Sequence, residues 1–478
     1  VNIWGRGNSI IVVDGIPRPT NYEFYLREVE TVTVLKDALT RSLYGAQGDQ
    51  GVIMVQTKRG RAYKREMDVQ LELGVLNPVS DAYPKYMNAG DYMETYNTIA
   101  PNTYSAQKIE DTRNGVNPYL NPDNDFYSKQ FLKSQSNYLN LFADASGGNN
   151  QGQYYVNLGW QHSNGWMNMS DQDTRDKFNF RGNIDYKLAE NFKMRLDAGA
   201  LFTLSKGPNV PDYWSQASTI LPNSYPLSWD PNLITDPIER AQILRSAQLV
   251  DGMLLGGSKS FPRNLYGDFQ KNGDRAITQR NLQVNLGAEW NLKFLLPGLK
   301  ASGNFSVDTY NTVVKSQTSK YAVYNPIPSV SATGDEIISA EVIGENVFAS
   351  NFAILSSEMV FQRKLGMFGN LTYDKKFGKT DVSLMAVAYG DKLAYTSAKQ
   401  DIVNQTFGFN GNIMHNKKFL IDFSYAVLGS QKLAKEDRYG LNTSIGLGWI
   451  LSEENFMANS KVFDFLKLRT TYGILNTD

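Results

Sequence analysis

The sequence predicts an all-β transmembrane barrel that follows a small α+β module at the N-terminal end. Segments of about ten to thirteen residues with alternating apolar and polar side chains recur from residue 67 onward. The connections between these segments alternate between short and very long. No run approaches the roughly 18 apolar residues that a transmembrane helix needs. The mean hydropathy of −0.39 agrees with a barrel, whose inward-facing polar residues dilute the apolar ones.

Residues 10 to 60 predict the N-terminal module. Ile10–Val13 is a short apolar strand, and Asp14-Gly15 suits a tight turn because glycine tolerates positive φ. A second strand is expected over 28–35, a short helical turn over 36–45 and a last strand over 52–55. The glycines of this stretch lack the spacing of a phosphate-binding loop, so no nucleotide site is expected.

The predicted barrel strands show strict period-two alternation. In residues 177–188, apolar side chains share one face with Gly182, and every position on the other face is polar. Residues 281–294 and 419–427 repeat this pattern. The alternation is typical of a half-solvated soluble sheet and also of a membrane barrel, and tilted strands of this length cross a bilayer.

The connections distinguish these two folds. Short connections are expected at 147–152, 189–191, 296–298, 377–379 and 415–418, and long ones at about 80–136, 163–175, 205–278 and 312–364. Outer-membrane barrels have short periplasmic turns and long extracellular loops. Soluble sandwiches seldom keep one set of ends short while the other grows past fifty residues. The connections therefore favour the barrel.

Charge and cysteine content narrow the class of protein. The 478 residues carry 48 Lys and Arg against 48 Asp and Glu, and no cysteine. A nucleic-acid-binding protein usually has a basic excess, so the balanced charge argues against that function. The lack of cysteine agrees with a periplasm-facing protein without deciding it.

Four blocks in the N-terminal module carry a resemblance to a known family. Their order and spacing resemble the plug domain of SusC/RagA-type TonB-dependent outer-membrane transporters. The blocks are Val12-Val13-Asp14-Gly15, Val29-Glu30-Thr31-Val32 running into Val34-Leu35-Lys36-Asp37, Leu43-Tyr44-Gly45, and Gly51-Val52-Ile53 closing on Thr57-Lys58-Arg59-Gly60.

Later segments extend the resemblance along the chain. Residues 138–148 with 154–159 resemble the first barrel hairpin of this family, and 180–185 resemble the next strand. Residues 448–454 and 465–473 resemble two further signatures, whereas Leu428-Gly429-Ser430 departs from relatives that carry an aspartate before Gly-Ser. The resemblance assigns residues 1–62 to the C-terminal part of a plug and 63–478 to the N-terminal part of a barrel.

The resemblance implies a barrel of about 22 antiparallel strands with the plug inside it. About thirteen candidate strands are counted in this chain, so a partial copy of the barrel is expected. The protein would lie in the bacterial outer membrane, in contact with the lipid bilayer and lipopolysaccharide.

The family also implies a function. It predicts import of a bulky nutrient, an oligosaccharide or oligopeptide, with a SusD-like surface lipoprotein and with TonB, which would act through a segment outside this chain. No enzymatic activity, cofactor or nucleic-acid partner is expected. The residues expected to shape the plug and its gating are Asp14, Gly15, Lys36, Asp37, Tyr44, Gly45, Gly51 and Lys58.

Two alternative functions remain open at this point. A SusC-like barrel of the same fold could serve as a structural or assembly subunit of a larger outer-membrane complex without transport, which the altered Leu428-Gly429-Ser430 element favours weakly. A soluble enzyme would need a catalytic constellation. His162 and His415 are the only histidines, and their distance in sequence gives no recognisable triad or zinc site.

Two acidic motifs have structural explanations. Asp268-x-Gln270-x-Asn272-Gly273 resembles the opening of a calcium loop, but Gln279 stands where a bidentate glutamate is expected, so no metal is predicted. Glu453-Glu454 is expected in a solvated turn rather than as a general acid and base.

Aromatic residues in the long loops are the candidate ligand or partner contacts. They could stack on sugar rings, pack against apolar peptide side chains or contact a partner protein, and Tyr213-Trp214 is the leading pair. The alternative is that they pack the loops together or form the aromatic girdle. The candidates are Trp166, Tyr213, Trp214, Tyr225, Trp229, Phe261 and Tyr266.

Overall fold

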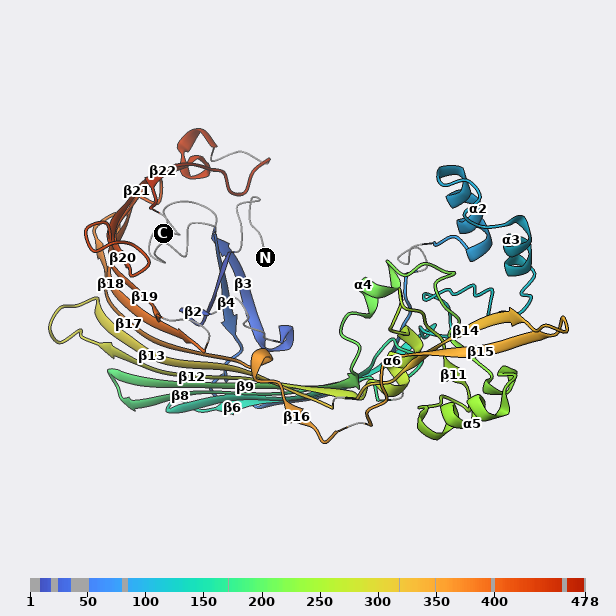
Figure 1. Cartoon of the computed structure of the whole chain (residues 1–478). Coiled ribbons are helices and arrows are strands. Elements are labelled where there is room, and N and C mark those ends of the chain that lie inside the picture. The colour runs from blue at the N-terminus through green and yellow to red at the C-terminus, as the bar shows by residue number, and fades with distance from the viewer. Residues whose placement is uncertain are drawn as a thin grey trace.

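A large curved sheet dominates the computed structural model, and a small sheet lies inside its curve (Figure 1). The structure describes residues 9–18, 25–35, 51–79, 85–170, 172–317, 319–348, 350–396, 400–457 and 462–476. Within these residues the large sheet has 14 strands, and β5 and β22 form its two edges. No helix in the described part of the chain is long and apolar enough to span a membrane.

The large sheet is antiparallel throughout, and chain neighbours pair with each other. Its order is β22-β21-β20-β19-β18-β17-β13-β12-β9-β8-β7-β6-β5, with the short β16 paired to β13. The strands are β5 (Glu66–Leu76), β6 (Ser136–Gly148), β7 (Gly152–Asn164), β8 (Thr174–Ala189), β9 (Phe192–Pro208), β12 (Asp274–Asn291), β13 (Leu299–Ser316), β16 (Ala353–Ile354), β17 (Val360–Phe377), β18 (Thr380–Tyr395), β19 (Ile402–His415), β20 (Phe419–Ser430), β21 (Tyr439–Ile450) and β22 (Lys467–Ile474). This up-and-down order confirms the predicted barrel fold.

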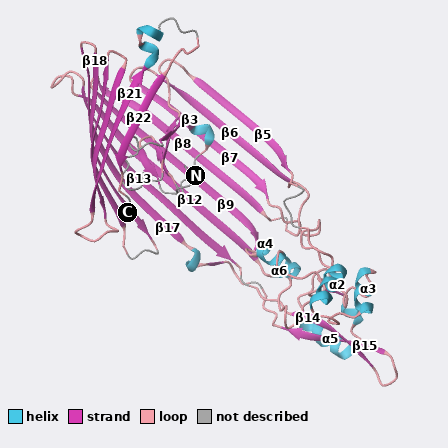
Figure 2. Ribbon diagram, turned by 90° about the horizontal axis from the view of Figure 1, so that it is seen from above, coloured by secondary structure: helices cyan, strands magenta, loops and turns pink. Residues whose placement is uncertain are grey.

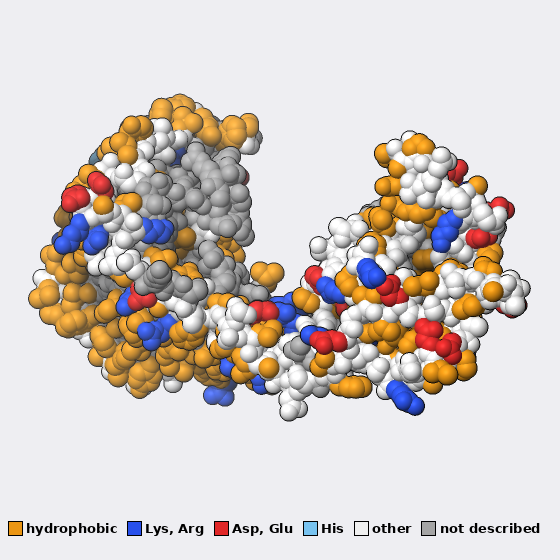
Figure 3. Space-filling model, viewed as in Figure 1, with side chains coloured by type: hydrophobic (Ala, Val, Ile, Leu, Met, Phe, Trp, Pro, Cys, Tyr) orange, Lys and Arg blue, Asp and Glu red, His pale blue; other side chains and the backbone are white. Residues whose placement is uncertain are grey.

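The alternation of the sequence becomes an apolar outer face and a polar inner face. On β8, Phe178 and Phe180 are exposed, whereas Asn179 and Arg181, which alternate with them, are buried. Hydrophobic side chains gather on the convex outer surface of the sheet (Figure 3). The inner face carries the polar side chains, and the small sheet contacts it through several of them.

The small sheet has the order β2-β1-β4-β3, formed by β1 (Ile10–Val13), β2 (Ile16–Arg18), β3 (Val29–Leu35) and β4 (Val52–Thr57). A 3-10 turn, η1 (Leu26–Glu28), precedes β3. The hairpin between β1 and β2 turns at Asp14 (φ 51°) and Gly15 (φ 86°), as the sequence predicts. Val13 and Val55 form its small core. The helical turn predicted over 36–45 lies outside the described residues.

The connections at one end of the large sheet are short, such as 149–151, 190–191, 378–379 and 416–418. The connection 451–466 at this end is longer than these and contains η6 (Leu451–Glu453) and η7 (Asn455–Met457). Glu454 follows η6 and accepts hydrogen bonds from Lys418 Nζ (2.7 Å) and Trp449 Nε1 (3.0 Å), which gives Glu454 a structural role, whereas Glu453 is exposed. His415 ends β19, so it lies in a strand rather than in the predicted turn.

The long connections at the other end form a separate arm (Figures 1 and 2). The sequence predicted these segments only as loops. The arm contains α2 (Ala89–Ile99), α3 (Ala106–Arg113), α4 (Tyr213–Ala217), β10 (Ser228–Trp229), η4 (Pro231–Leu233), α5 (Pro237–Ser246), β11 (Leu254–Leu255), α6 (Leu265–Lys271), β14 (Val323–Val330) and β15 (Glu336–Ile343), with η5 (Ser356–Glu358) where the chain returns to β17.

Candidate functional site: the interface between plug and barrel

The small sheet, here called the plug, meets the inner face of the large sheet through charged side chains. Arg18, the last residue of β2, forms an ion pair with Asp308 of β13, and its Nη2 donates to Asn285 Oδ1 of β12 at 2.9 Å. The side chains of Arg18 and Asp308 are 1% and 6% exposed. This contact joins residues almost three hundred positions apart in a nearly water-free environment.

A second buried pair has the opposite polarity. Glu28, at the end of η1, accepts hydrogen bonds from Arg181 Nε at 2.6 Å and from Asn179 Nδ2 at 2.9 Å. Both charged side chains are 5% exposed. Removing one partner of such a pair leaves an uncompensated buried charge and costs about 3–5 kcal/mol.

The third contact lies where the chain leaves the plug. Arg59 pairs with Asp197 at 2.7 Å and with Asp185 at 3.3 Å. Asn183 donates from Nδ2 to Thr57 Oγ1 (2.9 Å) and to the Lys58 carbonyl (2.8 Å). The end of β4 is thereby attached to β8 and β9 of the large sheet.

Two further contacts extend the interface at its sides. Arg27 reaches Asp144 of β6 at 3.4 Å and lies over the Phe142 ring, with Cζ 5.2 Å from the ring centre. Lys364 of β17 donates to the Pro17 carbonyl at 3.0 Å and pairs with Asp391 at 2.8 Å. Three plug arginines thus meet barrel aspartates, whereas Glu28 meets a barrel arginine.

The contacts given above hold the plug against the inner face of the large sheet. Apart from the Arg27–Phe142 ring contact, they pair opposite charges or hydrogen-bonding groups, and most of the paired groups come from separate parts of the chain. The plug cannot move as a body without breaking these pairs or hydrating them. We call this set of contacts the plug latch: Arg18–Asp308, Glu28–Arg181 and Arg59–Asp185/Asp197 with the Thr57–Asn183 bond.

Four of the predicted plug residues lie in described segments. Asp14 accepts from the Thr57 amide (3.0 Å) and from Thr57 Oγ1 (2.8 Å), which ties the β1–β2 turn to β4. Gly15 and Gly51 have φ of 86° and 110°, a backbone region that glycine favours. The Lys58 amide donates to the Glu28 carbonyl at 2.8 Å. Lys36, Asp37, Tyr44 and Gly45 lie outside the described residues.

Sequence reasoning missed the side chains that make the latch. The sequence does not predict contacts for Arg18, Glu28 and Arg59, because their partners lie more than one hundred residues away. The available signal was the alternation itself, which places Arg181, Asp185, Asp197 and Asp308 on the inner face. It does not say which plug residue each one meets.

The predicted loop aromatics lie in different environments. Tyr213, Tyr225 and Trp229 are 1%, 2% and 1% exposed and pack inside the arm, which favours the packing alternative for these three. Trp214 is 44% exposed and remains a candidate contact. The last three, Trp166, Phe261 and Tyr266, are partly buried.

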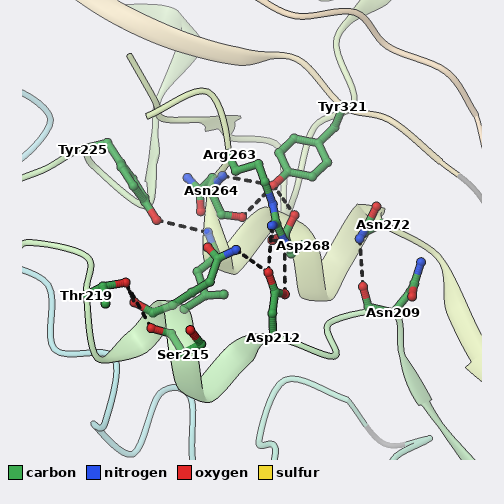
Figure 4. Close-up of polar contacts among 12 residues, drawn as sticks. Asn209, Asp212, Ser215, Thr219, Tyr225, Arg263, Asn264, Asp268, Asn272 and Tyr321 are labelled. Carbon is green, nitrogen blue, oxygen red and sulfur yellow. Dashed lines mark hydrogen bonds and ion pairs between the residues drawn. The ribbon is translucent and has the colours of Figure 1, made fainter. Parts of the chain in front are cut away.

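A polar network fixes the part of the arm that carries Tyr213 and Trp214 (Figure 4). Arg263 pairs with Asp212 (3.0 Å) and with the buried Asp268 (2.5 Å). Tyr321 donates from its hydroxyl to Asp268 Oδ1 at 2.6 Å. Burial raises the pKa of Asp268, whereas the hydrogen bond from Arg263 holds the pKa of Asp212 below its usual range.

The other motifs of the sequence have structural surroundings. Asp268 and Gln270 lie in α6 rather than in a calcium-type loop, and Gln279 lies in β12. His162 Nδ1 is 2.9 Å from Asp176 Oδ1 on the outer face of β7 and β8. The described part of the chain holds no group of three or more His, Cys, Asp or Glu side chains placed to bind a metal ion.

Comparison with known proteins agrees with this architecture. No family model matches the chain. It is 22% identical over 495 residues to TonB-dependent receptor P26 of Formosa agariphila, covering 99% of this chain and 46% of that protein. It is 21% identical over 480 residues to TonB-dependent receptor SusC of Bacteroides thetaiotaomicron, covering 94% of this chain and 43% of that protein. The chain therefore spans less than half the length of these curated relatives.

Solved structures show the same fold. The RagAB peptide importer in its closed-closed state superposes with a TM-score of 0.69 at 17% identity, covering 98% of this chain and 54% of that one. The open-open state of RagAB gives the same TM-score at 16% identity. The plug inside a sheet of up-and-down strands, together with relatives that match along nearly the whole chain, confirms the resemblance to SusC/RagA-type TonB-dependent receptors of the bacterial outer membrane.

Proposed function

We propose that this chain belongs to an importer that admits a bulky nutrient through the outer membrane when its plug is released. The observation that carries the proposal is the buried plug latch. Its charged pairs hold the plug against the inner face of the sheet. Release of the plug costs energy because these pairs must be broken or hydrated. An applied pull could supply that energy. The plug has to be released only when cargo is present, and a pull can be applied at that moment alone.

The partners follow from the same proposal. TonB would pull on the plug, and a SusD-like surface lipoprotein would deliver the cargo at the arm end of the barrel. The names of the relatives support TonB dependence, and RagAB is named as a peptide importer. The arm supports a delivery role because it holds most of the helices at the long-loop end, outside the sheet (Figure 2).

The structural-subunit alternative gains no support from the altered Leu428-Gly429-Ser430 element. These residues pair regularly with β19 on one side, and Leu428 and Gly429 pair with β21 on the other. Leu428 and Ser430 are each 6% exposed on the inner face. The departure therefore leaves the strand pairing intact.

Growth of the native host tests the proposed import. We expect a strain that lacks the gene to lose growth on one class of oligosaccharide or oligopeptide as sole source, and the full-length gene to restore it. Monosaccharides or amino acids of the same composition serve as the control, because they need no large pore. Unchanged growth of the deletion strain on every oligomer tested would contradict import.

A further inference from the structure

Exposed basic side chains gather on one part of the outer face of the large sheet, at the end that carries the long connections. Lys206 of β9 and Lys315 of β13 both pair with Ala276 of β12, so they flank it on the same face. Arg280 lies four residues further along β12 on that face, and Arg363 continues the set on β17. All four side chains are exposed. We call Lys206, Arg280, Lys315 and Arg363 the basic patch.

The basic patch has an excess of positive charge. Its four cations form no ion pair with a described residue. Lys392 of β18 lies beside the patch, but it pairs with Asp401 at 2.7 Å. Two carboxylates share this part of the face: Asp176, which accepts a hydrogen bond from Trp160 Nε1 at 3.1 Å, and Asp274 on β12. The cations of the patch therefore outnumber the acids beside them.

The gathering of charge is local to these strands. On the long-loop halves of β5 to β8 and of β19 to β22, the described residues of the outer face include no Lys or Arg. Lysines and arginines that only anchor a barrel at the membrane surface have no reason to collect on one side of it. The patch therefore points to a ligand at this place on the wall.

The height of the patch on the barrel places it at the headgroups of the outer leaflet. Arg280 lies eleven residues from Asn291, where β12 ends on the short-connection side. A strand that rises about 3.4 Å per residue and tilts by about 35–45° puts Arg280 about 30 Å above that end, whereas the apolar band is about 25 Å tall. Phe202 pairs with Arg280 on the same face, at the level of the outer aromatic girdle.

Nearer the membrane centre, the same part of the sheet has a groove in its apolar surface. Gly303 of β13 pairs with Gly369 of β17, and Gly390 of β18 pairs with Met367. These glycines line a groove of about 590 Å³, which is bordered by the larger side chains of Phe305 and Met367.

The backbone does not require these three glycines. None of Gly303, Gly369 and Gly390 has a positive φ, and a Cβ at each would meet no described atom nearer than 3.7 Å. The pairing of their strands shows no bulge. Glycine weakens a strand interior and often marks a place where another molecule approaches closely. On the outer face of this sheet, an acyl chain is such a molecule.

We propose that the basic patch binds the phosphates of one lipopolysaccharide molecule and that the groove receives one of its acyl chains. Gly369 lies six residues from Arg363 on β17, about 20 Å along the strand and about 15 Å along the membrane normal. Half of a hydrocarbon core of about 30 Å is also about 15 Å, so a chain attached near Arg363 reaches the groove. Arginine suits phosphate because its planar fork can bind two oxygens.

Lipid A, the anchor of lipopolysaccharide, fits both features because it joins phosphorylated sugars to several acyl chains. Thr309 and Asn311 lie between the arginines on the outer face of β13 and add polar partners for its sugars. Free phosphate would use the patch and leave the groove empty, and a second protein in the groove would have no need of the cations. The inference concerns the lipid around the protein and is independent of the proposed import.

Lipid binding to the purified full-length protein, in nanodiscs of phosphatidylcholine, tests the site. Lipid A from the host strain is titrated, and native mass spectrometry measures how many molecules each protein retains and at what concentration. We expect Arg280→Gln/Arg363→Gln to weaken retention of lipid A about tenfold or more. Gly369→Ile fills the groove and should weaken it about fourfold or more, the effect of uncovering one methylene of the chain.

Two matched controls separate the site from general effects of charge and bulk. Arg245→Gln removes an exposed arginine of α5 in the arm, and Ala143→Ile adds apolar bulk to the outer face of β6, away from the groove. Both should retain lipid A as the unchanged protein does. Lys206→Gln/Lys315→Gln removes the other two cations and tests the patch independently, should the arginine variant fold poorly.

The choice of lipid gives the outcomes that would overturn the site. Lipid A whose phosphates have been removed should be retained far more weakly, and phosphatidylglycerol and inorganic phosphate should not displace intact lipid A. Equal retention of phosphate-free lipid A, displacement by either competitor, or unchanged retention in both double variants would each contradict the proposal.

Discussion

At the scale of single residues, the plug latch depends on charges that have left water. Glu28 and Arg181 are each 5% exposed at the side chain and satisfy each other directly. A pair like this contributes little over two apolar residues of the same shape, but losing one partner is costly. The latch is therefore sensitive to single substitutions and tolerant of matched double ones.

Glu28→Gln should loosen the plug because Arg181 then loses the buried carboxylate that lies 2.6 Å from its Nε. We expect a destabilisation of about 3–5 kcal/mol at this contact. Hydrogen exchange of residues 25–35 in the full-length protein should rise. The double variant Glu28→Gln/Arg181→Met removes the stranded charge and should recover much of the protection; equal exchange in the two variants would argue against an ionic latch.

Gly60→Ala should disturb the exit from the plug. A Cβ at this position would lie 2.4 Å from the Tyr154 carbonyl oxygen and 2.5 Å from that of Gly147, and both are backbone atoms of strands that cannot yield easily. We expect lower yield of folded protein in outer membranes and a lower melting temperature. Gly390→Ala is the control, since its nearest neighbour is 3.9 Å away. Similar losses from both changes would count against the close approach.

At the scale of elements, the large sheet was predictable and the arm was not. Strands such as β8 and β12 can be predicted because period-two alternation is a local feature of the sequence. Helix α5 was missed although Asp236 caps it, accepting from the Ile238 amide at 2.8 Å with Pro237 following, a known start signal. Tyr213 and Trp214 are neighbours in sequence, yet one is buried and one exposed. Only tertiary packing determines which of the two side chains is buried.

The polar network of the arm should give it a stability that depends on pH in two opposite ways. Burial raises the pKa of Asp268, so its ionised form destabilises the arm, and this penalty is relieved as pH falls through the raised value. The pKa of Asp212 is lowered by Arg263, so its contribution is present above the unfolded value, about 3.9, and is lost below it.

We therefore expect the arm to gain stability as pH falls through the raised pKa of Asp268 toward about 4, and to lose it below that point. Hydrogen exchange of residues 209–273, corrected for the intrinsic effect of pH, measures this. The variant Asp268→Asn should flatten the gain between pH 7 and 4, because its amide does not titrate. A gain that persists unchanged in Asp268→Asn would assign the effect to other groups.

At the scale of the whole molecule, the chain combines an apolar exterior with a polar interior, and the plug latch holds the plug against that interior. The latch joins Arg18 to Asp308, 290 positions apart, and Glu28 to Arg181, 153 apart. Such pairs cannot be read from one sequence, because alternation gives the face of a residue but not its partner across the lumen. The sequence therefore predicts the fold and the face on which each residue lies, but it does not predict the contacts of the plug latch.

The separate latch contacts should act additively on leakage through the pore. Arg18→Ala and Arg59→Ala affect different strands of the large sheet, and contacts without shared partners usually add. We expect each to raise the sensitivity of cells to a large antibiotic, and the double variant to raise it by the product of the two effects. The matched control Arg61→Ala removes an exposed pair with Glu30 (3.2 Å) and should change little.

The most direct test of plug release is a covalent lock across the interface. Residues 1–478 contain no cysteine, so Thr57→Cys/Asn183→Cys adds a pair of thiols where the two side chains meet at 2.9 Å, closed by oxidation or by a short bifunctional thiol reagent. Thr31→Cys/Gln56→Cys cross-links two strands within the plug and is the control. If the plug must leave the wall, uptake stops in the locked protein, returns on reduction and continues in the control. Normal uptake through a fully locked interface would contradict the account.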